Sequence, residues 1–432
     1  MKGYSQTLLL VLLFLLLPVL GQAQKTKQDT LRDLIRKVEI LTKELEKEKL
    51  GEVSQRKYES KFGLGPAASQ VYHKKDPGVS LAGYGEIVFQ NFAEEKDDDT
   101  PGNTTNQIDY LRHILYVGYK FSDRFLFNAE IEFEHALAGD GKPGEVAMEF
   151  GYIDAMIVPE FTVRAGMVLA PIGIVNELHE PPTFLGALRP ETERRIIPTT
   201  WRANGIGFVG ATKSGFGYRA YLVEGLNAAK FSSNGIRSGL QSGAKAIAED
   251  FGLSGKIEYT GVPGLNAGAS FYTGNSGQGL TDSNGDEIGA NTTIFSVHGT
   301  FVRSGLELRA LYAKSSIGDV AELNDALGLT GSSSIGEDQF GYYITAAYDV
   351  FQFLKQGSTA ALQPFVQYEK LNTQDGVPSG FSINPARERT NLTIGLMYKP
   401  IPNVGFKLDF INRDNEAGTA LDQWNAAVTY LF

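Results

Sequence analysis

The chain has 432 residues, of which 42% are hydrophobic and 11% aromatic, with 49 Gly and no Cys. Its formal net charge of −10 is the opposite of what a general nucleic-acid binder carries, so no nucleic acid is expected as a partner. The many glycines and aromatic residues favour short strands and tight turns over helices, and the missing cysteines exclude a disulfide framework.

The first segment has the pattern of a secretory signal peptide. Lys2 precedes an apolar run from Leu8 to Leu20, and the small residues Gly21 and Ala23 form a cleavage site before Gln24. The run is shorter than the ~20 residues that a membrane helix needs, and no other stretch of the sequence approaches that length. No Cys follows the run, which excludes a lipoprotein anchor. We therefore predict that residues 1–23 are removed on export.

Residues 24–77 are predicted to form a periplasmic helix and a linker. Apolar residues in Leu31–Leu50 are spaced at alternating steps of three and four, namely Leu31, Leu34, Val38, Leu41 and Leu45. This pattern covers only about two heptads, fewer than a firm coiled-coil prediction requires. It fits a single amphipathic helix that lies on the membrane or on the mouth of the following domain, which is predicted below to be a barrel. It fits equally a bundle that joins subunits. Gly51–Pro77 has no regular pattern and is interrupted by Gly and Pro, so it is predicted to be the linker.

Residues 78–432 are dominated by a period of two, which is typical of β-strands. In Phe125–Glu134, for example, apolar residues alternate with Asn128, Glu130, Glu132 and Glu134. Strands are predicted to start near Val79, Gln107, Arg124, Val146, Phe161, Thr200, Phe216, Asp250, Gly264, Thr292, Gly305, Gln339, Ala360, Glu388, Val404 and Asp422. The links between them are alternately long and polar or only a few residues, as in an outer-membrane barrel. We predict an all-β fold, a transmembrane antiparallel β-barrel of about sixteen strands in a Gram-negative outer membrane.

The end of the chain supports the same fold. Trp424, Ala426, Val428, Tyr430 and Phe432 share one face of the last strand. The terminal Phe432 resembles the signal by which the barrel-assembly machinery recognises its substrates. Other aromatic residues are predicted to face lipid and lipopolysaccharide as interfacial girdles: Phe89, Tyr119, Phe121, Tyr152, Phe271, Tyr312, Tyr342, Tyr348 and Tyr398.

The layout resembles the phosphate-selective porin O/P family in its Bacteroidetes-like versions. The most distinctive stretch is Gly151–Gly210, where a strand is followed by a long loop rich in Pro and Arg and by a Gly-rich returning strand. The resemblance implies a homotrimer of sixteen-stranded diffusion pores. Phosphate-specific members carry an arginine ladder and lysine-rich loops, whereas the first long loop here has five carboxylates and Lys96. The anion preference of that family therefore does not follow for this chain.

The third long loop, Pro171–Thr199, is the candidate constriction of the pore. In porins this loop folds into the lumen, and here it is unusually apolar for a surface loop, so it needs a wall to pack against. Opposed acidic and basic groups in a lumen would orient solutes and set ion preference. Alternatively, the arginines of the loop pair with its own glutamates and only hold it in place. The candidate residues on or beside the loop are Arg189, Arg194, Arg195, Arg202, Glu177 and Glu180, and those on inward-facing strand positions are Arg164, Arg112, Arg219 and Arg309.

Motifs of enzymes and metal sites are missing from the sequence. There is no H-E-x-x-H, no G-x-S-x-G and no complete phosphate-binding loop, so no catalytic residue, metal or cofactor is predicted. Asp282, Asn284 and Asp286 match the spacing of calcium ligands, but Glu287 replaces the glycine that a calcium loop needs. Whether that loop binds calcium stays open.

The expected function is passive diffusion of small hydrophilic solutes and ions, with a preference for anions or phosphate as the more specific form. The alternative is a non-conducting barrel that acts as a surface adhesin or as an accessory subunit of an outer-membrane complex. Long outer loops fit either function, so the sequence leaves both open.

Overall fold

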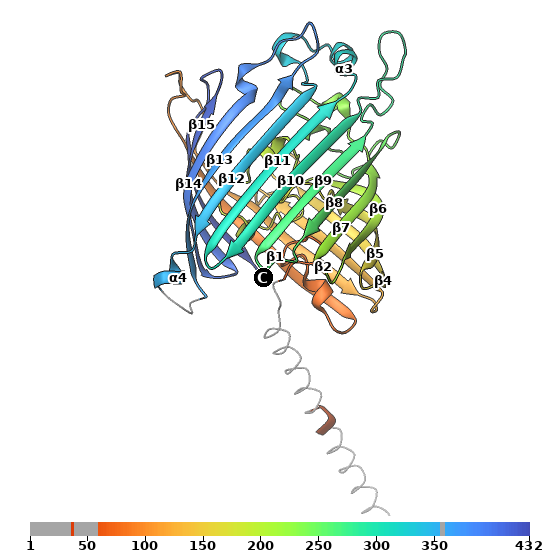
Figure 1. Cartoon of the computed structure of the whole chain (residues 1–432), viewed down its shortest axis with the longest axis vertical. Coiled ribbons are helices and arrows are strands. Elements are labelled where there is room, and N and C mark those ends of the chain that lie inside the picture. Colours follow the sequence, from red (N-terminus) through yellow and green to blue (C-terminus); the bar gives the residue numbers. More distant parts are fainter. Residues whose placement is uncertain (1–35, 39–58, 355–358) are drawn as a thin grey trace, which may run out of the picture. The chain divides into compact units, whose positions relative to one another are not determined.

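Alternating apolar and polar residues form sixteen antiparallel strands that close into one barrel (Figure 1). The computed structural model describes residues 36–38, 59–354 and 359–432. The strands are β1 (Gly78–Phe92), β2 (Gln107–Lys120), β3 (Phe125–Glu134), β4 (Val146–Val158), β5 (Phe161–Leu169), β6 (Arg202–Ala211), β7 (Phe216–Glu224), β8 (Phe251–Tyr259), β9 (Leu265–Gly274), β10 (Thr292–Arg303), β11 (Leu306–Ile317), β12 (Asp338–Tyr348), β13 (Ala361–Gly376), β14 (Glu388–Ile401), β15 (Val404–Asn415) and β16 (Gln423–Leu431).

The predicted strand starts are confirmed. Each lies within two residues of the observed start, the largest difference being Thr200 against Arg202 of β6. β1 pairs with β16 from Tyr84↔Leu431 to Phe92↔Gln423, so the sheet has no free edge. The backbone N–H and C=O groups of the wall are therefore satisfied by neighbouring strands all the way round, as a lipid environment requires.

Short helical elements lie in the connections and before β1. They are η1 (Gln70–His73), η2 (Pro181–Thr183), α2 (Glu191–Arg195), η3 (Ala228–Lys230), η4 (Arg237–Gly239), α3 (Val320–Ala326), η5 (Gly331–Ser333), α4 (Phe351–Leu354) and η6 (Pro385–Arg387). Among the helices in the described part of the chain, none has the length and apolar composition needed to cross a membrane. The predicted signal peptide and most of the predicted helix Leu31–Leu50 lie outside the described residues; residues 36–38 are helical.

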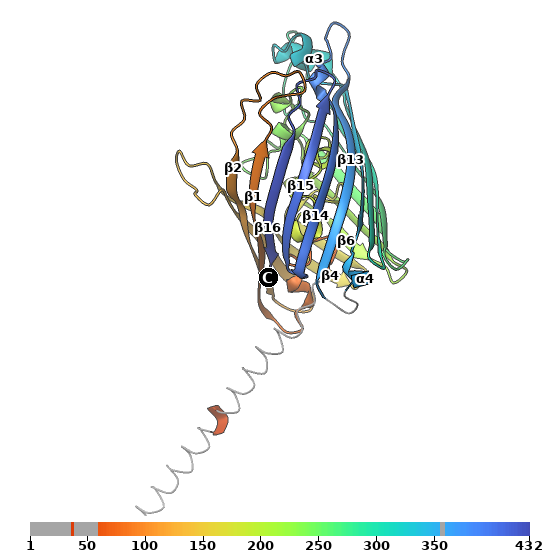
Figure 2. The same cartoon turned by 90° about the vertical axis from the view of Figure 1, so that its left-hand side faces the viewer.

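The long and short connections segregate to opposite ends of the barrel. The loop with α3 lies at the upper end in Figures 1 and 2, whereas the chain terminus after β16 and the tight turns lie at the lower end. The link between β12 and β13 is the exception at the lower end, because it contains α4. The alternation that the sequence predicts is therefore present in the fold.

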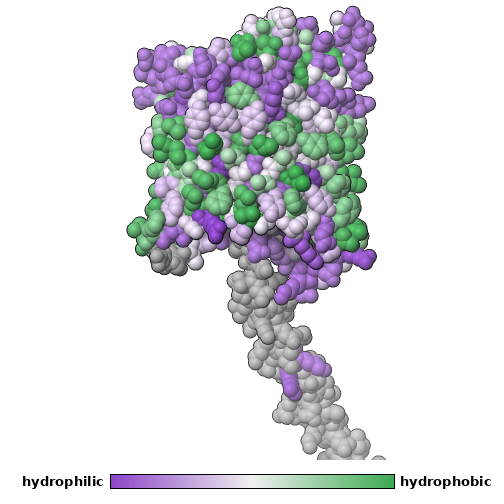
Figure 3. All heavy atoms as spheres, in the orientation of Figure 1, coloured by the Kyte–Doolittle hydropathy of each residue, from purple (hydrophilic) through white to green (hydrophobic). Residues whose placement is uncertain are grey.

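Polarity across the wall is the reverse of that in a soluble protein. Along β3, Phe125 and Phe133 are 48% and 40% exposed on the outside, whereas Glu130 and Glu132 are 0% and 4% exposed inside. Figure 3 shows the resulting apolar band across the visible face of the outer wall, between more polar ends. An apolar outside and a polar inside are the pattern of a barrel surrounded by lipid.

One residue of the predicted aromatic girdle lies on the inner face of the wall instead of the outer face. Tyr152 is 2% exposed and points into the lumen, where its ring packs under the guanidinium of Arg164 at 3.9 Å from Arg Cζ to the ring centroid. A bulge between β3 and β4 at Glu130 and Ile131 shifts the register. The alternate positions of β4 that face the lumen on one side of the bulge therefore face lipid on the other side. The prediction that Tyr152 faces lipid is wrong.

The described part of the predicted linker is not an exposed connection. Residues 59–77 lie within the same compact unit as the barrel, 58–432. Leu64, Ala67 and Ala68 are at most 3% exposed, and the amide of Asn128 on β3 donates to the Ala68 carbonyl at 2.9 Å. This stretch therefore packs against the inner wall of the barrel.

Candidate functional site

The connection between β5 and β6, residues 170–201 and called L3 below, folds into the lumen. Its apolar side chains Ile172, Ile196 and Ile197 are 0% exposed and belong to the core cluster inside the barrel. Burying these side chains against the wall supplies the apolar contact that the loop lacks by itself. The loop therefore lies where the sequence predicts it.

One side of L3 is held by a buried ion cluster. The carboxylate of Glu177 lies 2.8 Å from Arg219 of β7 and 3.2 Å from Lys256 of β8. Lys256 also donates to the carbonyl of Gly173 at 2.6 Å. Glu258 completes the cluster by accepting from Arg219 and lying 3.2 Å from Lys256. Two cations face two carboxylates here, so the cluster anchors the loop without leaving net charge.

The opposite side of L3 is held by cations that bind backbone carbonyl groups. Lys407 of β15 donates to the carbonyls of Pro181 and Gly186, both at 2.8 Å, and Lys399 of β14 donates to Pro182 at 2.6 Å. Carboxylates of the same wall accept from L3 amides: Asp409 from Ala187 at 2.6 Å and Glu369 from Thr192 at 2.6 Å. The loop thus crosses the lumen from β7 and β8 to β13–β15.

Above L3, at the long-loop end, lies a cavity of about 440 Å³ that we call the vestibule. Its charged lining consists of Arg194, Arg195, Arg389, Arg413, Glu191 and Asp414. The pKa of Glu191 reports this excess of cations: burial alone would raise it, but Arg195, Arg413 and Arg194 lower it to about 2. Four arginines against two carboxylates leave the vestibule positive.

Four arginines in or near the vestibule are not fully hydrogen-bonded by the described residues. One buried guanidinium nitrogen of each of Arg189, Arg387, Arg389 and Arg413 has no hydrogen-bond partner among the described residues. A buried donor without a partner is costly, and a guanidinium presents its donors in a planar fork that fits carboxylate and phosphate groups. Nearby, burial and the guanidinium groups of Arg194 and Arg189 lower the pKa of Arg237 to about 10.

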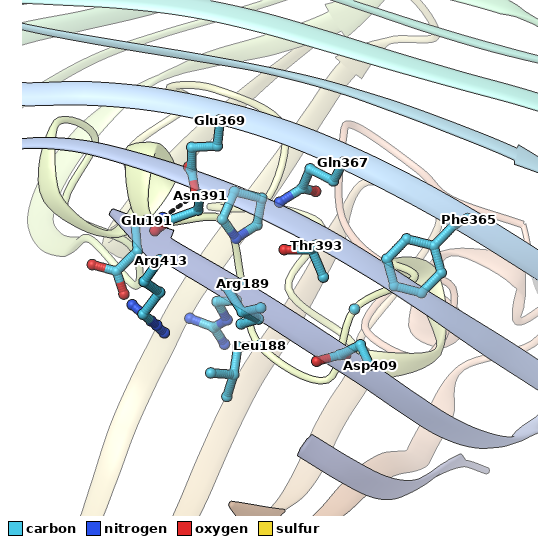
Figure 4. Close-up of a pocket in the computed structure, with 13 residues that line it drawn as sticks. Leu188, Arg189, Glu191, Phe365, Gln367, Glu369, Asn391, Thr393, Asp409 and Arg413 are labelled. Carbon is cyan, nitrogen blue, oxygen red and sulfur yellow. Dashed lines mark hydrogen bonds between the residues drawn. The ribbon is translucent and has the colours of Figure 1, made fainter. Parts of the chain in front are cut away.

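Two much smaller cavities lie along L3 beside the vestibule. A cavity of about 20 Å³, drawn in Figure 4, shares Leu188, Glu191, Asn391 and Arg413 with the vestibule lining. In the close-up, Arg189 and Arg413 stand on the same side as Glu191, and Asp409 lies at the other end. A second cavity of about 20 Å³ continues along the wall to Arg309 and Tyr343. Each has room for about one water molecule.

Three of the predicted arginines lie on the cavity side of L3. Arg189 donates to Thr200 Oγ1 at 2.9 Å, and Arg194 and Arg195 lie 3.3 and 2.5 Å from the carboxylate of Glu191. The alternative that the arginines pair with glutamates of the loop itself therefore holds for Arg194 and Arg195. Arg194 nevertheless keeps 55% of its side chain exposed to the vestibule.

The other predicted arginines are paired with carboxylates on the wall or on L3. The pairs are Arg164 with Asp154 at 2.7 Å, Arg112 with Glu86 at 2.8 Å, Arg202 with Glu149 at 2.5 Å, Arg309 with Glu307 at 2.6 Å and Arg219 with Glu177 at 2.8 Å. Of these five, Arg309 also lines a cavity. The structure does not bring the ten predicted residues together into one ring.

Glu180 faces away from the vestibule, toward residues 59–77. Its carboxylate accepts from the backbone N–H groups of Ala67 at 3.1 Å and Ala68 at 2.9 Å. Burial raises the pKa of this carboxyl to about 7, although the two donors act in the opposite direction. Glu180 therefore joins L3 to the segment before β1.

Arg389, Lys399 and Arg237 are site residues that the sequence did not predict. Arg389 and Lys399 occupy the same inward parity of β14 as the buried Asn391, so the alternation of that strand carried a signal for both. Arg237 lies in the connection between β7 and β8, where no period exists to show its direction.

The calcium alternative is not supported by the geometry of its loop. Asp282 accepts from the backbone N–H groups of Asn284 and Asp286, both at 2.8 Å, which is the role of a turn-forming aspartate. Across the described ranges, no group of three or more His, Cys, Asp or Glu is placed to hold a metal ion.

Comparison with known proteins gives a relative and a fold. The chain is 36% identical over 384 residues to an uncharacterized protein of Aquifex aeolicus (strain VF5), covering 87% of this chain and 84% of that protein. The chain belongs to the family of that protein. No family model matches the chain, so the resemblance to the phosphate-selective porin O/P family stays a prediction.

Solved structures share the barrel at low identity. OmpF of Salmonella typhi in complex with daunomycin has a TM-score of 0.52 at 15% identity, covering 82% of this chain and 97% of that one. A loop L8 deletion mutant of OmpT, an outer membrane protein of Vibrio cholerae, has a TM-score of 0.50 at 12% identity, covering 82% and 99%. This likeness shows a porin-like fold for the family.

Proposed function

We propose that this protein is an outer-membrane porin for passive diffusion of small hydrophilic solutes and ions, with a preference for anions. The observation that carries the proposal is the positive vestibule beside L3, the loop that crosses the lumen. Anions entering from the long-loop end meet four arginines and two carboxylates, of which Glu191, Arg194 and Arg195 belong to L3 itself. Charge rings beside a constriction select ions by sign, so a net positive vestibule favours anions.

Phosphate is the more specific form of this proposal. It is supported by the guanidinium groups of Arg194, Arg195, Arg389 and Arg413 that line the vestibule, because phosphate oxygens accept hydrogen bonds from planar guanidinium donors well. The five acidic residues of the first long loop oppose it at the outer surface. The proposal includes no enzymatic activity.

The outer membrane is the proposed location, with lipid and lipopolysaccharide as partners of the apolar band. The band is formed by outward side chains such as Ile344 and Ile394, each 57% exposed. Export through cleavage near Ala23 and recognition of Phe432 by the barrel-assembly machinery are parts of the same proposal.

A homotrimer is the proposed assembly. A polar cluster on the outer wall supports it, formed by Tyr110 and His113 of β2 and Tyr430 of β16. Tyr430 Oη lies 2.6 Å from Tyr110 Oη and 2.9 Å from His113 Nδ1. An ionisable side chain in contact with lipid is costly, and a second copy would shield it. Native electrophoresis of unheated detergent extracts tests this, with a monomer as the contradicting result.

Planar-bilayer recording of the purified protein tests the function. Open steps and a reversal potential that reports anion preference in a KCl gradient are expected. Silence at every voltage would instead favour the second candidate, a non-conducting surface adhesin or accessory subunit. That candidate is favoured by the course of L3, which crosses the lumen and is held by Lys256 on one side and by Lys407 and Glu369 on the other. A cation-directed reversal potential would contradict the anion preference but not the channel.

A further inference from the structure

Residues 59–77 occupy the lumen at the short-turn end of the barrel, although the barrel closes without them. The sixteen-strand ladder is complete from β1 to β16 and includes none of these residues. Within the segment, Leu64, Ala67, Ala68 and Val71 are at most 3% exposed. A segment that adds nothing to the closure of the wall, yet is ordered inside it, needs another reason for its position.

The segment is held by the packing of Phe62, Leu64, Ala67 and Ala68 into the core cluster inside the barrel, and by polar contacts with the wall. Tyr72 Oη donates to Asp154 of β4 at 2.7 Å and accepts from Arg164 of β5 at 2.7 Å. Lys120, at the end of β2, donates to the carbonyl of Lys75 at 2.8 Å. Each of these groups can exchange its partner for water in a polar lumen, so the segment can leave without stranding polar groups.

Glycine at two positions lets the segment approach its partners closely. Val71 packs on Gly118 of β2, where an added Cβ would lie 2.6 Å from Val71 Cβ. Gly65 lies against Glu180 of L3, where an added Cβ would lie 2.3 Å from the carboxyl carbon. A side chain at either position would require the segment to shift slightly from the wall or from L3.

The contact with L3 is the one that reaches the pore. Glu180 binds the N–H groups of Ala67 and Ala68, and in the same loop Glu177 lies 3.0 Å from the Cβ that Gly63 would carry. Each end of this contact is buried: Glu180 is 1% exposed and Ala67 is 0% exposed. A displacement of the segment therefore removes support from beneath the loop that bounds the narrow cavities.

We infer that residues 59–77 are a plug: they narrow the lumen below L3, hold L3 through Glu180, and widen the pore when they withdraw. The inference rests on the proposed channel function for its effect on current. Its structural part, the withdrawal of the segment, can be tested without current.

The chain has no cysteine, so an introduced pair reports only on itself. The double variant Val71→Cys/Gly118→Cys can lock the plug, since linked Cβ atoms lie about 3.5–4.5 Å apart and a shift of roughly 1 Å accommodates the bond. Glu180→Gln releases it, because Ala67 and Ala68 donate to different carboxylate oxygens and the amide replaces one of these with an NH2 group that cannot accept. Glu322→Gln on the exposed side of the long-loop end is the matched control.

Bilayer conductance and labelling are measured on the same full-length proteins. We expect the oxidised double variant to conduct less than its reduced form, and Glu180→Gln to conduct at least 1.5-fold more than the parent and the control. In detergent, a maleimide reagent should modify Ala68→Cys several-fold faster when Glu180→Gln is present. Equal labelling rates, or open channels of equal conductance in the locked, reduced and released forms, would overturn the plug. Silence of all proteins with a labelling difference would overturn the channel and keep the plug.

Discussion

The carboxylate of Glu177 on L3 lies 2.8 Å from the guanidinium of Arg219 on β7, and both side chains are 3% exposed. This pair joins a loop to a strand in the interior of the barrel. Arg219 and Lys256 share Glu177 and Glu258, so the removal of one carboxylate leaves two buried cations facing one partner. The position of L3 depends on that balance.

Glu177→Ala is therefore expected to loosen L3 while the wall stays intact. Removing one member of a buried pair costs about 3–5 kcal/mol, because the other member remains buried without compensation. A protease that cleaves in L3 should cut the variant in detergent at least tenfold faster than the parent, while electrophoretic mobility of the unheated barrel stays the same. Glu322→Ala, away from L3, is the control. Cleavage rates equal to the parent would contradict the anchoring role.

Arg194→Gln/Arg195→Gln should shift ion selectivity toward cations. The vestibule would then have two arginines and two carboxylates in its lining, so its net charge falls to zero. We expect the reversal potential in a KCl gradient to move toward the cation value and the conductance to change less than twofold. Arg303→Gln is the control, because it also removes one positive charge per substitution but lies at the exposed end of β10, outside the vestibule. If both variants shift selectivity equally, the vestibule is not the filter.

The fold could be predicted from the sequence because a barrel wall is periodic. One face of every strand meets lipid and the other the lumen, so the alternation in Phe125–Glu134 or in β15 reads directly as outside and inside. Tyr152 was assigned to the wrong face because the bulge at Glu130 and Ile131 resets the parity, and a bulge leaves no period in the sequence. The local sequence pattern therefore predicts the strands of the wall and their two faces, but it assigns residues to the wrong face where a bulge shifts the register.

The site could be predicted only in part because its contacts are long-range. The apolar content of Pro171–Thr199 indicates an inward loop, but the partner of Glu180 is a backbone segment 112 residues earlier in the chain. Ala67 and Ala68 have no polar side chain from which this contact could be predicted, because they donate through their backbone N–H groups. Likewise, Arg164 and Arg219 have inward parity, but nothing in sequence shows that Asp154 and Glu177 neutralise them.

Glu191 should stay ionised well below the usual range of a glutamate. Its pKa of about 2 in the fold lies below the ~4.3 of an unperturbed glutamate, so the stabilisation that it contributes is present above pH ~4.3 and is lost as pH falls through about 2. The difference in reversal potential between the parent and Glu191→Gln should therefore persist from pH 7 to pH 4. Other carboxylates titrate in both proteins and cancel. A fall of this difference to about one-third of its pH 7 value by pH 4 would show an ordinary pKa of ~4.3.

The apolar band makes a prediction that is independent of the pore. Ile344 lies in the middle of β12 and is 57% exposed on the outer wall, where Ile344→Arg would place a charge in lipid. Such a charge costs about 2–4 kcal/mol near the bilayer midplane and about 0–1 kcal/mol near the interfaces. Thr293→Arg, an outward position near the long-loop end of β10, is the matched control. We expect unfolding in urea-containing lipid vesicles at clearly lower denaturant for Ile344→Arg than for Thr293→Arg. Equal midpoints would mean that the band of Figure 3 is not the surface in contact with lipid.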